Sequence, residues 1–258
     1  MELTLADIRV RLGTIQALDG VSIRFASGRV TAILGPNGAG KSTLASVAEG
    51  LRAADTGSAT LGDRPLGALP VRERARLIGY LPQSAALHWN IAARELVALG
   101  RLPHRGPFGG MAAADWVAVD RAMEATDTTV FAARPTAELS GGERARVLLA
   151  RVLAGEPRWI IADEPLAGLD PAHQLDVLAR LRDAARAGVG VVLVLHDLSH
   201  AARAADDALL LAGGRAVASG PVADVMTPAR LREVYGIDVF VGTDGAGGPV
   251  LVPFARTR

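Results

Sequence analysis

The segment from Gly35 to Ser42 constrains the fold of this chain more than any other part of its sequence. It reads Gly-Pro-Asn-Gly-Ala-Gly-Lys-Ser and fits the pattern G-x-x-x-x-G-K-S. The apolar run Val30–Leu34 precedes it and is typical of a buried parallel strand, and a helix is predicted from Lys41 to about Gly50. A strand, a glycine-rich loop and a helix in this order open a βα unit.

Such a loop is suited to bind phosphate groups. Its glycines let successive backbone N–H groups curve around a β-phosphate, and the N-terminus of the helix adds its dipole. The pattern indicates a nucleoside triphosphate; a loop that matches by chance is the alternative, which the flanking strand and helix disfavour. The residues expected to hold the nucleotide are Gly35, Pro36, Asn37, Gly38, Ala39, Gly40, Lys41, Ser42 and Thr43.

Lys41 is the only lysine in the chain. The sequence holds 28 Lys and Arg residues in total, so all the others are arginines. Coding bias explains the excess of arginine, but a lysine is kept where a compact ammonium on a slim stem is needed, and a planar guanidinium cannot replace it. We therefore expect Lys41 to neutralise the β- and γ-phosphates while the Ser42 hydroxyl ligates Mg²⁺.

Composition excludes several classes of protein. The formal net charge is +1, so no basic field favours a nucleic-acid partner. The absence of cysteine rules out disulfides, zinc–thiolate sites and a cysteine nucleophile, and it fits the cytoplasm. No apolar run approaches ~18 residues, and no basic segment leads into an apolar one at the N-terminus, so we expect neither a membrane span nor a signal peptide.

The hydropathy pattern predicts strands within residues 2–34 and helical spacing after position 84. The later segments are predicted to be helices over 91–100, 113–126, 141–154 and 171–187, buried strands over 159–162 and 189–195, one helix near 221–235 and a hairpin over 238–254. We interpret the chain as a single domain over 1–258. Its core comprises 1–83 and 155–237, a helical subdomain spans 84–154, and a hairpin extension spans 238–258.

Two acidic residues follow the buried strand that begins at Trp159. The strand delivers Asp163 to the carboxyl edge of the sheet, where it can hold Mg²⁺ through water, and Glu164 is placed to orient or deprotonate an attacking water. Pairs of acidic residues at strand ends are common, so the alternative interpretation is that Asp163 and Glu164 have no catalytic role. His196 ends another apolar strand, and a lone histidine at such a place is more often a surface or core residue than a catalytic one.

A second anion-binding helix start is predicted at Leu139, Ser140, Gly141, Gly142 and Glu143. It is well separated in sequence from the first. One chain with two phosphate-facing helix ends suggests a two-fold, head-to-tail pair. Each nucleotide would then lie between the glycine loop of one copy and the Ser-Gly-Gly of the other.

Taken in order, these motifs resemble the nucleotide-binding subunit of ABC (ATP-binding cassette) transporters, and the resemblance covers essentially the whole chain. The residues that carry it are Gly35–Ser42, Gln83, Leu139–Glu143, Asp163, Glu164, Gly168, Leu169, Asp170 and His196. It implies an α/β fold: a P-loop NTPase core, with a mixed or parallel sheet flanked by helices, an antiparallel β part near the N-terminus and a small α-helical subdomain.

The resemblance also implies roles. The cofactors would be ATP and Mg²⁺, with Ser42, Gln83 and Asp163 around the metal. Gln83 would contact Mg²⁺ and the attacking water and link the core to the helical insert, Asp170 would lie at the dimer interface, and His196 would contact the γ-phosphate.

One position departs from that family. Its members usually stack adenine on an aromatic residue in the first strands, but this chain has Arg-Val-Arg-Leu-Gly over residues 9–13. Arg11 or Leu12 could cover the base instead, by guanidinium stacking or apolar contact. Selectivity for adenine over guanine is therefore open.

Softer features around residues 97–105, 120–128 and 196–206 resemble importers of iron chelates, haem and cobalamin. That resemblance implies a peripheral protein on the cytoplasmic face of the bacterial inner membrane. Its partners would be a second copy, polytopic permease subunits and, indirectly, a substrate-binding protein, with the stretch 84–105 meeting the coupling helices of the membrane partner.

Other functions remain open. One is a transporter ATPase for another substrate class. Another is a soluble ABC ATPase of DNA repair or translation, which the single cassette and the absence of heptads disfavour. A non-hydrolysing binding subunit is disfavoured because Glu164 and His196 are both present. His104, His173 and His200 are interpreted as surface residues, and His88 and Trp89 as packing or partner contacts.

Overall fold

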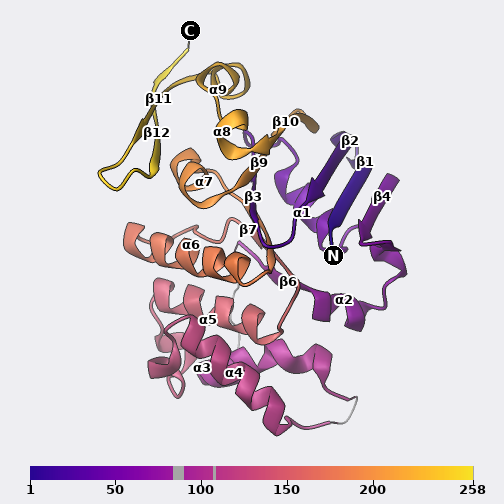
Figure 1. The fold of residues 1–258 in the computed structure, drawn as a ribbon. Coiled ribbons are helices and arrows are strands. Elements are labelled where there is room, and N and C mark those ends of the chain that lie inside the picture. The colour runs from indigo at the N-terminus through magenta and orange to yellow at the C-terminus, as the bar shows by residue number, and fades with distance from the viewer. Residues whose placement is uncertain (84–89, 107–108, 258) are drawn as a thin grey trace.

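A computed structural model describes residues 1–83, 90–106 and 109–257 (Figure 1). His88, Trp89 and the first part of the stretch 84–105 lie outside the described residues. The strands are β1 (Leu3–Leu12), β2 (Ile15–Phe25), β3 (Val30–Leu34), β4 (Thr56–Leu61), β5 (Arg64–Pro65), β6 (Ile78–Leu81), β7 (Trp159–Asp163), β8 (Gly190–Val194), β9 (Asp207–Ala212), β10 (Arg215–Pro221), β11 (Ile237–Thr243) and β12 (Pro249–Arg256). The helices are α1 (Lys41–Ala48), α2 (Val71–Leu77), α3 (Ala93–Ala98), α4 (Ala113–Ala125), α5 (Gly141–Ala154), α6 (Pro171–Arg186), α7 (Leu198–Ala204), α8 (Val222–Val225) and α9 (Pro228–Tyr235).

The central sheet has the strand order β10-β9-β3-β8-β7-β6, and only the β9–β10 pair is antiparallel. Every residue of β3, β7 and β8 is buried. Their continuous apolar sequences suit strands that are covered on both faces. Because these strands run parallel, their carboxyl ends meet at one edge, which brings the loop after Leu34, the residue Asp163 and the segment after Val194 together.

Alternate residues of these strands face two separate cores. Ile33, Ile161 and Val194 pack with β1, β2 and α1, whereas Ala32, Ile160 and Leu193 pack with α5 and α6. The first core is closed by a four-stranded antiparallel sheet of order β2-β1-β4-β5. This arrangement confirms the predicted α/β class with an antiparallel β part near the N-terminus.

Helices α3, α4 and α5 form a lobe beside the central sheet (Figure 1). A buried arginine ties this lobe together: Arg101 donates to Asp115 Oδ1 at 2.9 Å and to the Ala154 carbonyl at 2.9 Å. The helix predicted over 141–154 agrees with α5, and those predicted over 91–100 and 113–126 agree with α3 and α4 to within a few residues. None of the helices among the described residues combines the length and apolarity that crossing a bilayer requires.

The predicted single helix near 221–235 is wrong, because two helices occupy that segment. Thr227 caps α9 by accepting a hydrogen bond from the Arg230 backbone, and Pro228 occupies the first position of that helix. Proline has no N–H and fits only the first turn, so α8 cannot run on into α9. The predicted hairpin is present as β11 and β12.

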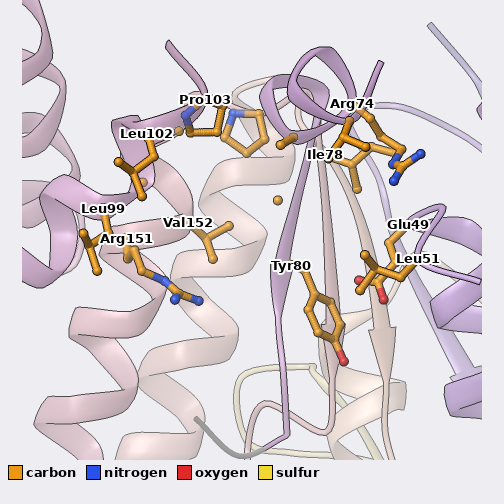
Figure 2. A pocket seen from close by; sticks show the side chains of 16 residues that line it. Glu49, Leu51, Arg74, Ile78, Tyr80, Leu99, Leu102, Pro103, Arg151 and Val152 are labelled. Atoms are coloured by element: carbon orange, nitrogen blue, oxygen red, sulfur yellow. The ribbon is translucent and has the colours of Figure 1, made fainter. Parts of the chain in front are cut away.

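Glu49, the C-cap of α1, has a carboxyl group that is buried inside the protein (Figure 2). The residue is only 4% exposed, and its Oε2 atom has no hydrogen-bond partner within the described part of the chain. Burial raises the pKa of Glu49 to about 7; the charge of Asp163 raises it further and that of Arg74 opposes the shift. No local sequence signal marks this buried group, because its burial depends on the tertiary fold.

The buried carboxyl predicts a pH-dependent stability. In the folded protein Glu49 binds its proton up to about pH 7, but in the unfolded chain it releases it near 4.5, so stability falls as pH rises through that interval. Glu49→Gln does not titrate. We expect it to unfold at nearly the same denaturant concentration as the wild type at pH 5 and to be more stable at pH 8, by at most about 3 kcal/mol.

The measurement is urea unfolding of both proteins at pH 5, 6.5 and 8. Glu124→Gln, at an exposed position of α4, is the control and should track the wild type at each pH. A difference between Glu49→Gln and wild type that stays constant across this range would show that Glu49 does not titrate there.

Candidate functional site

The loop between β3 and α1 has the backbone conformation that its glycines permit. Gly35, Gly38 and Gly40 have φ angles of 149°, 79° and 96°. At Gly40 there is also no room for a side chain, because a Cβ atom would lie 2.4 Å from the Ala17 carbonyl oxygen of β2. The loop is therefore held against the antiparallel sheet by close backbone packing.

These glycines supply a matched pair of substitutions. Gly38→Ala meets no atom within 4 Å and suffers only the unfavourable φ, so we expect a loss of about 1–2 kcal/mol. Gly40→Ala adds the clash with Ala17 and should lose more than about 3 kcal/mol. Thermal unfolding of the two variants and the wild type checks whether Gly40→Ala loses more stability than Gly38→Ala. Equal losses would contradict the role of close packing at Gly40.

Lys41 lies inside the loop with its ammonium group facing backbone oxygens. It is 6% exposed, and its Nζ donates to the carbonyls of Gly35 at 2.8 Å and Pro36 at 3.1 Å. Burial lowers the pKa of Lys41, while the charges of Glu164 and Asp163 raise it. The loop thus holds a desolvated cation in place, as an anion-binding cradle requires.

Ser42 and Asp163 bring two oxygen ligands together at the carboxyl edge of the sheet. Ser42 Oγ donates to Asp163 Oδ1 at 3.2 Å. Burial raises the pKa of Asp163, and the hydrogen bond from Ser42 lowers it. A hydroxyl and a carboxylate are the ligands that Mg²⁺ accepts, so this pair fits the ion. Among the described residues there is no cluster of three His, Cys, Asp or Glu side chains that could hold a metal alone, so water molecules and phosphate oxygens would complete the shell of the ion.

Glu164 lies at the centre of a small polar cluster. Its backbone has a φ of 50°, and its N–H donates to the Val194 carbonyl at 3.1 Å. Gln83, which follows β6, donates from Nε2 to Glu164 Oε2, and His196 Nε2 is hydrogen-bonded to Glu164 Oε1. The three predicted catalytic side chains, from three separate segments, therefore meet at one carboxylate.

The Ser140 region forms the capped start of α5. Ser140 Oγ accepts from the Glu143 backbone at 3.3 Å, and Glu143 Oε2 accepts from the Ser140 backbone at 2.8 Å, which is a capping box. Glu143 also pairs with Arg134 at 2.9 Å, and the Ser140 N–H bond is the largest of the contacts that hold the pKa of Glu143 low. Glu143 is thus occupied in holding the helix start, while Leu139 is buried beneath it.

His173, interpreted from the sequence as a surface residue, has a side chain that is 30% exposed and that connects two of the predicted motifs. Asp170 caps α6, accepting from the His173 backbone at 3.0 Å and bonding to its Nδ1 at 2.6 Å. A Cβ atom built on Gly142 would lie 2.1 Å from the His173 ring. The ring therefore covers Gly142, and the spacing of three residues from Asp170 on a helix was the signal for it. The His173 backbone N–H is also the main cause of the lowered pKa of Asp170.

The two predicted adenine contacts lie at the tip of the hairpin between β1 and β2. Leu12 is 39% exposed, and the Arg11 backbone donates to Asp55 Oδ2 at 2.7 Å. The same hairpin reaches the loop through Ala17, which contacts Gly40. Nothing in this geometry chooses between Arg11 and Leu12, so the adenine contact stays a prediction.

Comparisons with known proteins find similar sequences and similar structures. A family model described as ABC transporter matches residues 18–167. The hemin import ATP-binding protein HmuV of Streptomyces coelicolor is 45% identical over 245 residues, which are 95% of this chain and 87% of that protein. Two solved structures are similar. A metal-chelate type ABC transporter in an inward-facing conformation has a TM-score of 0.85 at 24% identity, covering 98% of this chain and 97% of that one. The dimeric structure of a bacterial ABC transporter cassette has a TM-score of 0.74 at 27% identity, covering 85% and 98%.

Proposed function

Because this chain belongs to the ABC transporter family and is an ATPase of that family, we propose that it powers the import of a haem-type metal chelate. The observation that carries the proposal is the pair of helix starts in one chain: the loop before α1 with its buried lysine, and the capped Ser-Gly-Gly start of α5. The name of the Streptomyces relative supports haem as the cargo.

The residues divide the chemistry between them. Lys41 would exchange its carbonyl partners for the β- and γ-phosphate oxygens of ATP. Ser42 and Asp163, with Gln83, would hold Mg²⁺, which would neutralise developing charge on the phosphates. Glu164 orients the attacking water and accepts its proton. His196 and Gln83 hold the two oxygens of that carboxylate in position, and His196 contacts the γ-phosphate.

We propose that two copies enclose two ATP molecules. The first N–H groups of α5 have no partner within their own helix, which is true of every helix start. Gly142 is covered by His173, but Gly141 is exposed and has no side chain, which leaves room for a phosphate of the second copy. Asp170 lies close by and would meet the partner's loop. The likeness to a dimeric cassette supports this pairing. ATP would close the dimer, and hydrolysis with phosphate release would reopen it.

The proposed assembly includes two polytopic membrane subunits and, indirectly, a substrate-binding protein, with this chain on the cytoplasmic face of the bacterial inner membrane. The test is to recover tagged Glu164→Gln protein with MgATP from detergent-solubilised native membranes. A polytopic membrane subunit in stoichiometric yield is expected, and its binding protein can then be titrated with haem, iron–siderophores and cobalamin.

Each outcome decides between the candidates. Haem binding by the binding protein supports the full proposal. If it binds another ligand instead, the chain still serves an importer, but haem is not the cargo. Recovery only from the soluble fraction, with nucleic acid or ribosomes, would replace the transporter by a soluble ABC ATPase.

A further inference from the structure

The C-terminal hairpin of β11 and β12 is attached to α7 by two side chains, and Figure 1 shows it beside α7 and α9. Ser199 Oγ, on α7, donates to the Leu251 carbonyl of β12. Arg203, one turn further along α7, pairs with Asp244 in the hairpin turn at 2.8 Å. Asp244 also accepts from two backbone N–H groups of that turn, at 2.8 and 2.9 Å, which shapes the turn for this contact. The hairpin is therefore held to α7 both at its turn and at β12.

Helix α7 directly follows His196 in the chain, and only Asp197 lies between them. Asp197 caps the helix and accepts from the backbone N–H groups of Ser199 at 2.7 Å and His200 at 3.0 Å. The helix has only seven residues. A helix this short is not stable by itself and takes its position from the elements it packs against. The position of the His196 backbone therefore depends on α7 and, through α7, on the hairpin.

The imidazole ring of His196 is held by little besides its own backbone. Its side chain is 47% exposed, and its one hydrogen bond within the described part of the chain joins Nε2 to Glu164 Oε1. In the proposed function that carboxylate orients the attacking water, so a displaced ring would disturb both the γ-phosphate contact and the base. A misplacement of about 1 Å in a catalytic group can slow a reaction by about 100-fold.

The other end of the hairpin begins beside the loop between β3 and α1. Strand β11 follows α9, and the last residue of α9 is Tyr235. The hydroxyl of Tyr235 is buried; burial raises the pKa of Tyr235 to about 12, and the backbone N–H of Gly35 opposes that rise. The hairpin thus extends from the loop at Gly35 to the helix after His196, which are two segments that the proposed function places at the phosphates.

We propose that the C-terminal hairpin sets the position of His196 during hydrolysis, and that Ser199 and Arg203 are positioning residues that act through α7. This inference rests on the proposed function in one respect, which is the role of His196 at the γ-phosphate, and it adds a task for the hairpin. The side chains of Arg203 and Asp244 are 45% and 30% exposed, and exposed ion pairs contribute little to stability. Removal of the pair should therefore shift α7 without unfolding the chain.

The test is the double variant Ser199→Ala/Arg203→Gln, which removes both attachments. We expect its kcat for ATP hydrolysis to fall by about tenfold. Its Kd for ATP should stay within about twofold of the wild-type value, because the loop around Lys41 is unchanged. Arg232→Gln is the matched control. Arg232, on α9, pairs with Asp238 of the same hairpin at 2.8 Å, away from α7, so this variant should keep the wild-type kcat. An unchanged kcat in the double variant, or an equal fall in Arg232→Gln, would overturn the inference.

A second comparison shows whether the effect passes through His196. In a His196→Ala background, the same double substitution should not slow single-turnover phosphate release any further, because the side chain that it displaces is already absent. A loss that adds in full to that of His196→Ala would place the effect elsewhere and contradict the inference. If His196→Ala hydrolyses ATP at the wild-type rate, the proposed role of His196 is wrong and the inference fails with it. If His196→Ala is slow and the double variant is not, only the inference is wrong.

Discussion

Glu164→Gln is expected to reduce ATP hydrolysis by at least about 100-fold while ATP binding remains. The variant keeps the size and most hydrogen-bonding capacity of the side chain, so Gln83 and His196 still have a partner at that place. What it lacks is a carboxylate that can accept a proton from water. The closed state should accumulate, and size-exclusion chromatography with MgATP should show a dimer that the wild type does not retain.

The measurement is phosphate release under saturating MgATP, paired with a nucleotide titration of the same preparation. Glu124→Gln, on the exposed face of α4, removes one carboxylate elsewhere and should hydrolyse ATP at the wild-type rate. Full turnover in Glu164→Gln would remove that residue from its role and leave His196 as the remaining candidate base. If Glu164→Gln loses both ATP binding and ATP hydrolysis, the substitution instead disturbs the loop at Lys41.

The parts of this molecule that could be predicted from sequence are those with local causes. The helix predicted over 141–154 has the observed bounds, and its start has a local cause, since Ser140 and Glu143 form a capping box within four residues. The loop at Gly35 was predicted because its glycines, the preceding apolar strand and the following helix are contiguous. Parallel strands align their carboxyl ends, which explains why Asp163, Glu164 and His196 meet, although the role of His196 was implied by the resemblance to ABC transporters and not by the strand pattern.

Other features depend on contacts between distant segments and carry no local signal. The Gly142 backbone is covered by His173, which comes from a different helix. The burial of Glu49 results from α1 lying under a second sheet and beside α2, and an acidic residue at a helix end is normally exposed. The split between α8 and α9 does have a local signal, because Thr227 is a capping residue and Pro228 is suited to the first position of a helix.

Lys41→Ala is expected to abolish ATP binding at micromolar nucleotide, with a Kd at least about 100-fold higher, equivalent to about 3 kcal/mol. The ammonium is the only side-chain cation within the loop, and it is already desolvated and pointed at the carbonyls that surround the phosphate position. Its removal takes away charge-assisted hydrogen bonds to two phosphates and leaves a cavity beneath the loop. Lys41→Arg keeps the charge but should raise the Kd for ATP by nearly as much. The planar guanidinium cannot fit where Nζ makes hydrogen bonds of 2.8 and 3.1 Å.

Fluorescent-nucleotide titration of both variants decides between charge and shape. If Lys41→Arg binds like the wild type, charge alone suffices, and the single lysine in a chain otherwise rich in arginine needs another explanation. If both variants lose binding while their thermal unfolding matches that of the wild type, the site requires the slim ammonium itself. Unchanged affinity in Lys41→Ala would contradict the phosphate cradle. The glycines with positive φ would then serve only the turn between β3 and α1.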